Sequence, residues 1–515
     1  MEGLRSHSFK PDRRSRSWSS NSRPLIRTRL HRYQHGLISR FKAQRRPRRT
    51  LFASMLIVLA LYFVFFRESL NVDVNPRVAL PSLDLGVPPN AGEGLPEVVN
   101  GPPTARFRDN LKNDSSYITS WSNAGFTNQF MNYVNMIYLG TLTDRIPIIP
   151  PFAPDHHISS SAGIIPFGDI FDLDQLRQQL RLPILEWRDV KKLPSRYSTD
   201  PYSTTKVENL GCWTTRKENE GEPIRAENVV HHLGLDVSYT RVPTFTRLEP
   251  WNRDEPHVVF PKLAALIYPR DPIASPDSFP HLAPSPFGHH LPPEAHISCF
   301  DTMYYATSGS DHYEWRFSWS PVWRTVGRHL QFTQEMKDLG RQYLARVFGL
   351  EGSEEIPPFI VVHVRHGDFA FFCGGHQDCF PPLSAYQAHV DKIKRELIEK
   401  RSLPVPNVVL VSGPSQPFVS FSYVLQARPL AYVDEKSPLF WNNVKSHGWF
   451  FIDHAQEKTF ERLGEWYPPL VDIVIQIYAV GFVGTEDSTF SLVGQRRVQD
   501  WNDGVTLNVN VRNGY

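Results

Sequence analysis

The sequence predicts an α/β protein of two lobes, each a parallel sheet with helices on both faces, and a cleft between the lobes. Short apolar runs typical of buried strands alternate with amphipathic helical segments. The alternation occurs in two stretches, residues 117–190 and 333–510, separated by an irregular zone rich in Pro and Trp. The 515 residues also leave room for two ordinary domains with accessory segments.

The first stretch begins with "YITSW", residues 117–121, which we expect to be a strand. Apolar Phe130, Val134 and Ile137 then fall at helical spacing. "RIPIIPPF", residues 145–152, reads as an extended segment, and residues 169–180 read as an amphipathic helix with an Asp at its start. Residues 190–330 contain no motif that predicts a structure or a function.

The second stretch begins at Thr333, which is placed to cap a helix that ends near Gly349. Strands are predicted at 359–365 and 407–412, and a helix at 384–400. A nearly all-apolar helix is predicted at 470–480, followed by "GFVGTEDSTFSLVGQRRVQDW". No internal repeat is visible.

The N-terminal residues 1–50 form a strongly basic segment. They hold 15 Lys and Arg against Glu2 and Asp12, a net charge of +13, whereas the whole chain carries only +3. The rest of the chain is therefore mildly acidic. A basic arm can bind nucleic acid, but the segment that follows favours a membrane surface, and we expect no nucleic-acid partner.

Residues 51–66, "LFASMLIVLALYFVFF", contain no charge and end at Arg67. This run is short for a spanning helix, which needs about 17–25 residues, although flanking Arg side chains can extend it. A signal peptide or a core helix are the alternatives, but no small-x-small cleavage site follows and no amphipathic spacing is present. We interpret 51–67 as a signal anchor in the lipid bilayer, with "QRRPRR" keeping the N-terminus cytoplasmic.

This interpretation predicts a single-pass type II protein of the Golgi or ER membrane. Its parts would be a basic cytoplasmic tail (1–50), the anchor (51–67), a Pro- and Gly-rich stem (68–115), an N-terminal lobe (116–345) and a C-terminal lobe (346–510). Asn113 begins an Asn-Asp-Ser sequon and is a predicted glycosylation site.

The chain contains four cysteines, which could form two disulfides in an oxidising lumen: Cys212, Cys299, Cys373 and Cys379. Cys373 and Cys379 are close in sequence and form the natural local pair. "CGGHQDC" could instead bind zinc, but it lacks a second paired cluster, so we expect no metal there.

"FIVVHVRHGDFAF", residues 359–371, places polar side chains at the tip of a buried strand. Alternation puts His363 and Arg365 on one face, and Asp368 follows at the turn. Ligands of open α/β sheets bind beyond the carboxyl ends of the strands. Arg365 could therefore hold a phosphate with His363 as a second donor. The alternative is an Arg365–Asp368 ion pair that merely closes the loop.

"GFVGTEDSTF", residues 481–490, could form an anion site, because Ser488, Thr489 and Phe490 stand where a helix begins. A plain Ser N-cap is the alternative. Asp472 lies on the preceding apolar helix, where a carboxylate could accept the N–H groups of guanine. It could equally be an Asp at a helix start, after Pro468 and Pro469.

Two further stretches carry polar residues in turns. "WSNAGFTNQ", residues 121–129, is a Gly-containing turn from strand to helix with two side-chain amides, and it could hold a phosphate or a sugar. Asp172-Leu173-Asp174 spells the D-x-D of metal-dependent sugar transferases. Because it opens an amphipathic helix, we interpret it as helix capping.

Together, in this order, three motifs resemble those of the GDP-fucose protein O-fucosyltransferase family. They are "NAGFTNQFMNYVNMIYLGTLTDRIPIIPPF", "HVRHGDF" and "LVDIVIQIYAVGFVGTEDSTFSLVGQRR", and they span residues 123–497. The resemblance implies a GT-B glycosyltransferase with two Rossmann-like lobes. It would be a metal-independent enzyme without a cofactor, using GDP-fucose as donor and a protein or glycan hydroxyl as acceptor.

The resemblance also implies roles for single residues. Arg365 would stabilise the leaving diphosphate, and Asn128 would lie near the fucose and the acceptor, beside Gly125 and Phe126 in the same loop. Further substrate contacts would come from the C-terminal lobe: His363, Asp368, Asp472, Ser488, Thr489 and Phe490.

This sequence departs from the family pattern at two points. Gly413 stands where many relatives have a polar side chain, and no carboxylate lies inside "NAGFTNQ" to act as a general base. Extensive departure of the leaving group before attack would make such a base less necessary. The alternative function is a membrane-anchored sugar-nucleotide or glycan binder on the same scaffold that has lost catalysis.

Overall fold

The structure of the chain is a computed structural model. The residues that it describes are 98–155, 158–195, 206–217, 222–268, 281–352, 354–365, 380–402, 407–412 and 438–510. The predicted anchor, 51–67, lies outside these ranges. Among the described residues, no helix has both the length and the apolar composition of a membrane span.

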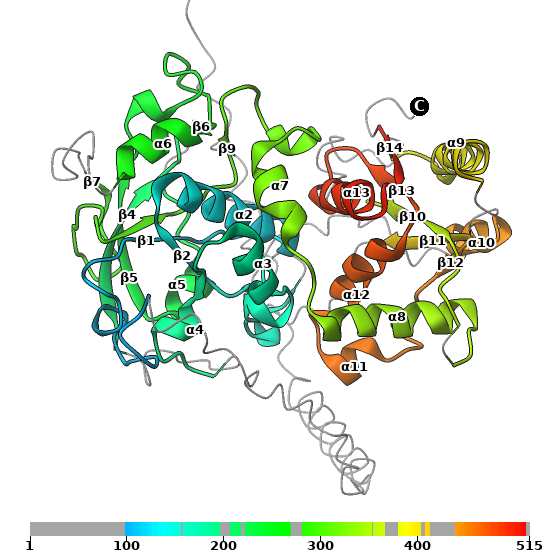
Figure 1. Cartoon of the computed structure of the whole chain (residues 1–515), viewed down its shortest axis with the longest axis horizontal. Coiled ribbons are helices and arrows are strands. Elements are labelled where there is room, and N and C mark those ends of the chain that lie inside the picture. The colour runs from blue at the N-terminus through cyan, green and yellow to red at the C-terminus, as the bar shows by residue number, and fades with distance from the viewer. Residues whose placement is uncertain are drawn as a thin grey trace, which may run out of the picture. The chain divides into compact units, whose positions relative to one another are not determined.

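Two separate sheets confirm the predicted α/β class (Figure 1). The N-terminal sheet has the order β3-β2-β1-β8-β4-β5-β7, in which every pairing is parallel except the antiparallel β5–β7 edge. Its strands are β1 (Tyr117–Ser120), β2 (Ile146–Ile149), β3 (Leu185–Glu186), β4 (Glu208–Thr214), β5 (Leu235–Arg241), β7 (His281–Ala283) and β8 (Ile297–Phe300). Two short strands, β6 (Val258–Val259) and β9 (Ala306–Thr307), form a separate parallel pair.

The C-terminal sheet is parallel throughout, with the order β12-β11-β10-β13-β14. Its strands are β10 (Phe359–Val364), β11 (Asn407–Ser412), β12 (Phe450–Phe451), β13 (Gly481–Thr485) and β14 (Val505–Val509). Numbered along the chain within this lobe, the order is 3-2-1-4-5, the arrangement of a doubly wound nucleotide-binding sheet.

Helices cover the faces of both sheets. Those of the N-terminal lobe are α2 (Phe126–Thr143), α3 (Leu173–Leu180), α4 (Trp187–Val190), α5 (Glu227–His232), α6 (Phe260–Ile267) and α7 (Pro321–Thr325). Those of the C-terminal lobe are α8 (Gln334–Phe348), α9 (Leu383–Arg401), α10 (Pro438–Ser446), α11 (Thr459–Leu463), α12 (Tyr467–Ile475) and α13 (Thr489–Asn502).

Strand β10 sends alternate side chains to opposite faces of its sheet. Ile360 and Val362 pack in the cluster with α9 and α10, whereas Phe359 and Val361 pack in the cluster with α8 and α12. Figure 1 shows these two helix pairs on opposite sides of the C-terminal sheet. The alternation therefore sends His363 to the second face, toward α13.

Two predicted boundaries differ from the structure. The C-terminal part of the predicted stem is packed, because Phe107 is fully buried against Trp187 at 5.4 Å between ring centroids. The predicted lobe border at 345/346 falls inside α8. Residues on the N-terminal side of this border pack on the C-terminal lobe, since Tyr343 and Leu344 share a core with Val471.

Candidate functional site

The order of the C-terminal sheet places a binding crevice at one position. Strand order reverses between β10 and β13, and ligands of such sheets bind outside the carboxyl ends of the strands at this point. His363 and Arg365 stand at the end of β10, and Thr485 and Ser488 stand at the end of β13 and just after it. The structure thus brings together residues 120 or more positions apart.

His363 is fully buried and held from two sides. Its Nδ1 lies 2.6 Å from Ser491 Oγ of α13, and the ring of Phe490 stacks on its imidazole at 4.3 Å between centroids. Ser491 Oγ also accepts a hydrogen bond from Thr485 N–H at 2.9 Å. The Ser491 hydroxyl can then donate its hydrogen bond to His363 Nδ1. In that arrangement Nδ1 is the acceptor, and the neutral imidazole carries its proton on Nε2.

Arg365 is half-buried, and its backbone is fixed by the neighbouring strand. Its N–H donates to Thr485 Oγ1 at 2.9 Å, and the same hydroxyl donates to the His363 carbonyl at 3.0 Å. Tyr386 OH contacts Thr485 Oγ1 at 2.8 Å, and burial raises the pKa of Tyr386 to about 12. The neutral phenol therefore remains a donor, and the strand tip that carries the guanidinium is held rigidly.

Ser488 is the N-cap of α13. Its hydroxyl accepts from Ser491 N–H at 3.5 Å and is buried, so the contacts of this side chain are those of the simple capping alternative. Thr489 and Phe490 are half-buried in the first turn. A helix start still offers backbone N–H groups and the positive end of the helix dipole, which favour an anion at this edge of the sheet.

Gly481 and Gly484 serve packing. A Cβ on Gly481 would lie 2.8 Å from Ile393 of α9, and one on Gly484 would lie 2.8 Å from Ser491 of α13. Both contacts are closer than side chains tolerate. The glycines therefore let two helices approach β13.

Asn128 lies in the first turn of α2, the helix that follows β1 in the N-terminal lobe. Its Oδ1 is buried and accepts no hydrogen bond from the described part of the chain. A buried, unsatisfied amide oxygen costs about 1–3 kcal/mol unless a ligand or water pairs with it. Gly125, the N-cap, faces open space, because an added Cβ would meet no atom within 4 Å.

Phe126 packs in an aromatic cluster. Its ring lies 4.4 Å from Phe152 and 6.4 Å from Trp466 of the C-terminal lobe, measured between centroids. These contacts make Phe126 part of the core shared by the two lobes. A contact between this residue and a substrate stays a prediction.

The side chain of Gln129 holds the loop before α2, a role that the sequence did not indicate. Its Nε2 donates to the carbonyls of Ala124 at 2.7 Å and Ala153 at 2.8 Å, and its Oε1 accepts from Ala153 N–H at 3.0 Å. Ala124 has a φ of 144°, a conformation that costs a non-glycine residue about 1–3 kcal/mol. Strained backbone is thus held next to Asn128.

Two more side-chain amides on α2 form hydrogen bonds with the backbone of the segment that follows β8. Asn132 Oδ1 accepts from Met303 N–H at 2.5 Å, and Asn135 Nδ2 donates to the Met303 carbonyl at 2.7 Å. Asn128, Asn132 and Asn135 follow helical spacing and lie on one side of α2. That spacing was the signal by which the sequence could have shown these two positioning residues.

Asp472 lies in the second turn of α12, so it is not the helix-start residue that the alternative interpretation expected. Its Oδ1 lies 3.1 Å from His454 Nε2, and burial raises the pKa of its carboxyl. His454 Nδ1 in turn contacts Thr459 Oγ1 at 3.1 Å. One carboxylate oxygen is therefore engaged by a histidine, and guanine reading by Asp472 stays a prediction.

The remaining predicted residues fall into three groups. Asp172 accepts from Gln175 N–H at 2.9 Å as the N-cap of α3, which confirms the capping interpretation. Asn113 is exposed just before β1. Asp368, Cys373 and Cys379 lie outside the described residues, so their predicted roles stay predictions.

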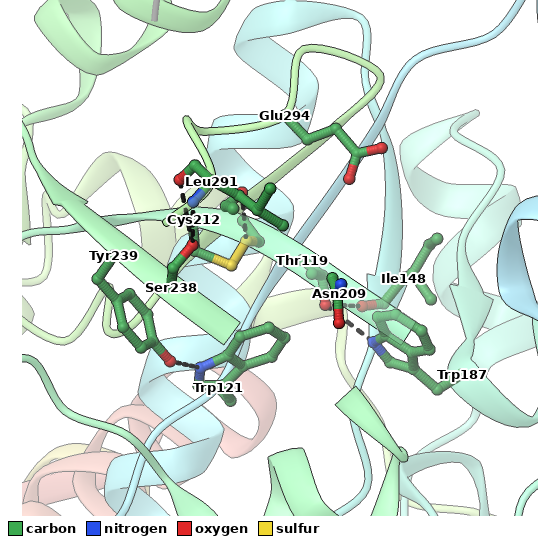
Figure 2. Close-up of a disulfide and its surroundings, with 12 residues drawn as sticks. Thr119, Trp121, Ile148, Trp187, Asn209, Cys212, Ser238, Tyr239, Leu291 and Glu294 are labelled. Atoms are coloured by element: carbon green, nitrogen blue, oxygen red, sulfur yellow. Dashed lines mark hydrogen bonds between the residues drawn. A yellow bond between two sulfur atoms is a disulfide. The ribbon is translucent and has the colours of Figure 1, made fainter. Parts of the chain in front are cut away.

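A disulfide joins Cys212 of β4 to Cys299 of β8 inside the N-terminal lobe, with 4.8 Å between the Cα atoms (Figure 2). Two buried indoles lie close by. Trp121 Nε1 donates to Tyr239 OH at 2.9 Å, and Trp187 Nε1 donates to Thr119 Oγ1 at 3.0 Å. The bond cross-links neighbouring regions of one sheet and is remote in sequence from the predicted donor-site motifs.

The sequence model of the GDP-fucose protein O-fucosyltransferase family matches residues 117–406, more than half of the chain. The chain therefore belongs to this family of GDP-fucose-dependent fucosyltransferases. This finding confirms the resemblance that the motifs suggested. No curated protein matches the chain in sequence.

Several solved structures are similar to this chain at a distance. POFUT1 in complex with GDP-fucose is 12% identical, with 78% of this chain and 98% of that chain covered and a TM-score of 0.45. NodZ alpha-1,6-fucosyltransferase soaked with GDP-fucose is 11% identical, with coverage of 75% and 93% and a TM-score of 0.34. Fucosyltransferase NodZ from Bradyrhizobium is 12% identical, with coverage of 74% and 92% and a TM-score of 0.33. Likenesses this distant transfer no residue roles.

Proposed function

We propose that this fucosyltransferase moves fucose from GDP-fucose to a hydroxyl group of a protein or glycan, in the lumen of the secretory pathway and without a metal ion at the reacting centre. The observation that carries the proposal is the cluster at the ends of β10 and β13. An arginine and the positive end of a helix dipole meet there at the switch point of a parallel sheet.

Arg365 has the central role in this proposal. Its planar guanidinium can donate two parallel hydrogen bonds to diphosphate oxygens. Negative charge grows on the diphosphate as the bond to fucose breaks, so these hydrogen bonds strengthen toward the transition state. The Thr485 hydroxyl holds the strand tip, which reduces the reorganisation needed when the charge develops.

The same groups support metal independence. Arg365 and the N-terminus of α13 place fixed positive charge where a divalent ion would otherwise stabilise the leaving group. The scaffold that we propose is the GT-B arrangement, with the donor in the C-terminal lobe and the acceptor on the side of the N-terminal lobe. Asn128 would contribute its unpaired Oδ1 to the fucose or to the acceptor hydroxyl.

No carboxylate lies in the loop that precedes Asn128. We therefore propose that the leaving group departs largely before the acceptor attacks. An acceptor hydroxyl facing a cation-like sugar needs little activation by a base. In this mechanism the acceptor proton can pass to an oxygen of the departing diphosphate.

A panel of nucleotide sugars tests the activity. The full chain should bind and slowly hydrolyse GDP-fucose in preference to GDP-mannose and UDP-sugars. Hydrolysis is the suitable readout because it can be measured without an acceptor. Added Mg²⁺ or Mn²⁺ should leave turnover unchanged. Equal use of UDP-sugars, or turnover that requires either ion, would overturn the proposal.

The lumenal location rests on the predicted anchor and is supported by two described features. Asn113 of the sequon is exposed, and Cys212 and Cys299 are disulfide-bonded, as expected in an oxidising compartment. Expressed in secretory cells, the chain should shift in mobility on glycosidase treatment, and Asn113→Gln should abolish the shift. A wild-type chain that never shifts would contradict the type II topology.

A further inference from the structure

A cluster of two histidines and one glutamate lies in the N-terminal lobe. Glu255 Oε1 is 2.5 Å from His257 Nδ1, and its Oε2 is 2.6 Å from His312 Nε2. One potential ligand atom from each residue lies within 4.8 Å of the others. Glu249 Oε1 approaches the same His312 nitrogen at 3.6 Å.

Burial distinguishes this cluster from a surface ion pair. Glu255 is 5% exposed and His257 is 9% exposed, whereas His312 opens the cluster to solvent. His257 Nε2 is buried without a hydrogen-bond partner in the described part of the chain.

The donor set indicates which ion would fit. Two imidazole nitrogens and a carboxylate are ligands that Zn²⁺ prefers, while Mg²⁺ and Ca²⁺ prefer oxygen alone. Glu249 or water could complete a tetrahedral shell. Ligand atoms around tetrahedral zinc lie about 3.3 Å apart, and the ligand atoms of this cluster all lie within 4.8 Å of one another.

The position of the cluster gives such an ion a structural task. Glu255 and His257 precede β6, and His312 follows β9, the partner strand of β6. The segment with His312 continues to Arg316, which is 2.5 Å from Asp487, directly before the N-cap of α13. An ion in the cluster would therefore brace a loop that contacts the start of the proposed phosphate-binding helix.

We propose that Glu255, His257 and His312 form a structural zinc site that fixes this loop. The ion is separate from the chemistry of sugar transfer, for which we propose no metal. Its loss should lower the melting temperature and weaken donor binding through the Arg316–Asp487 contact. It should not remove a group that touches the reacting atoms.

Zinc binding by the full chain tests the site directly. After loading and dialysis into metal-free buffer, elemental analysis should find about one retained zinc per chain. His257→Gln and His312→Gln should each weaken zinc affinity by at least about tenfold. His289→Gln is the matched control, because His289 is paired with a single carboxylate, Asp236, at 2.7 Å and is similarly exposed (45% against 47% for His312).

Two further measurements keep the proposal testable if a variant folds poorly. Co²⁺ added to the wild type should give the intense visible absorption of a tetrahedral site, and zinc should raise the melting temperature of the wild type and of His289→Gln alike. Zinc retention that is unchanged in His257→Gln and His312→Gln would overturn the proposal. So would weak Co²⁺ absorption of the octahedral kind, or a wild type that retains no zinc.

Discussion

At the residue scale, the hydroxyl of Thr485 fixes the backbone that carries the Arg365 side chain. It donates to the His363 carbonyl and accepts from the Arg365 N–H, so it replaces a ladder hydrogen bond where β10 ends. The backbone is thereby fixed on both sides of Val364. A long guanidinium on a fixed backbone loses less conformational entropy when it binds a diphosphate than one on a flexible loop.

Arg365→Lys should reduce turnover almost as much as Arg365→Ala, because an ammonium group cannot reproduce the planar two-point fork. Loss of one oriented donor at such a centre typically reduces the rate by about 10²–10³. The effect should appear in kcat more than in donor affinity.

Steady-state kinetics and melting curves on these variants provide the measurement, with Arg395→Lys on the exposed side of α9 as the control. If Arg365 only closed the loop by an ion pair, Arg365→Ala would melt at a lower temperature, and kcat would follow the folded fraction.

Asp472 supports a prediction on pH. If its carboxylate accepts the N–H groups of guanine, only the ionised form serves, and burial raises the pKa of this carboxyl above its usual value. GDP affinity of the wild type should therefore fall on the acid side, starting closer to neutrality than for an ordinary Asp. Asp472→Asn should bind GDP more weakly at pH 7, by about 1.5–3 kcal/mol, and should lose the pH dependence.

Isothermal titration with GDP from pH 5 to 8 checks both statements, and UDP serves as the reference ligand. Unchanged GDP affinity in Asp472→Asn would leave the residue with its contact to His454 alone.

The sequence predicted part of this site for a physical reason. His363, Arg365 and Ser488 follow apolar runs whose strand character is local, so their place at the sheet edge could be deduced. The partners of these residues could not be. Ser491 and Thr485 bind across more than 100 residues, and a single hydroxyl gives no periodic signal.

At the element scale, dependence on partners distant in sequence explains why residues 190–330 contain no motif that predicts their structure. Strands β4 and β5 have a neighbouring strand on each side but carry acidic residues, Glu208 and Asp236, which break the apolar pattern. Their charges are satisfied by distant partners, Lys191 at 3.0 Å and Ser285 at 2.6 Å. Buried polar groups need such partners, and single-sequence periodicity cannot supply them.

The start of α2 gives an element-scale prediction. Gln129→Met keeps the length of the side chain but removes its three hydrogen bonds to Ala124 and Ala153. Each buried group left unpaired costs about 1–3 kcal/mol. The melting temperature should fall, and kcat/KM should fall further than the folded fraction explains, because the loop beside Asn128 loses its support.

Gln178→Met, an exposed position on α3, is the matched control and should behave as the wild type. A Gln129→Met chain with normal melting and normal kcat/KM would show that the strained turn at Ala124 keeps its conformation without these hydrogen bonds.

At the scale of the whole molecule, the two lobes share a hydrophobic core. One cluster of buried residues contains Phe130 and Phe171 of the N-terminal lobe together with Leu470 and Val493 of the C-terminal lobe. Polar contacts add to it, such as Trp323 Nε1 donating to Asp500 at 2.6 Å. The sequence predicted two lobes but not this junction, because each residue in it fits the core of its own lobe equally well.

Arg497 of α13 is a charged residue at this junction. Its guanidinium carbon lies 4.7 Å from the ring centroid of Phe332, 5.0 Å from that of Phe130 and 5.7 Å from that of Trp501. It is 2% exposed, and its Nε and Nη2 have no hydrogen-bond partner in the described part of the chain. Burial lowers its pKa to about 9.

These contacts predict an unusual order of stability for substitutions at this position. Contacts with aromatic faces return about 0.5–2 kcal/mol each, whereas burying a charge costs several kcal/mol. Arg497→Met removes the charge and keeps most of the apolar volume, so its free energy of unfolding should equal or exceed that of the wild type. Arg497→Lys should be less stable than either, because an ammonium group is more strongly hydrated than a guanidinium and cannot spread over several rings.

Denaturant unfolding of the three chains at pH 7 measures this order, and turnover of Arg497→Met should stay near the wild-type value if the cation has no part in the chemistry. A methionine variant as unstable as the lysine variant would show that the aromatic contacts outweigh the cost of burying the charge.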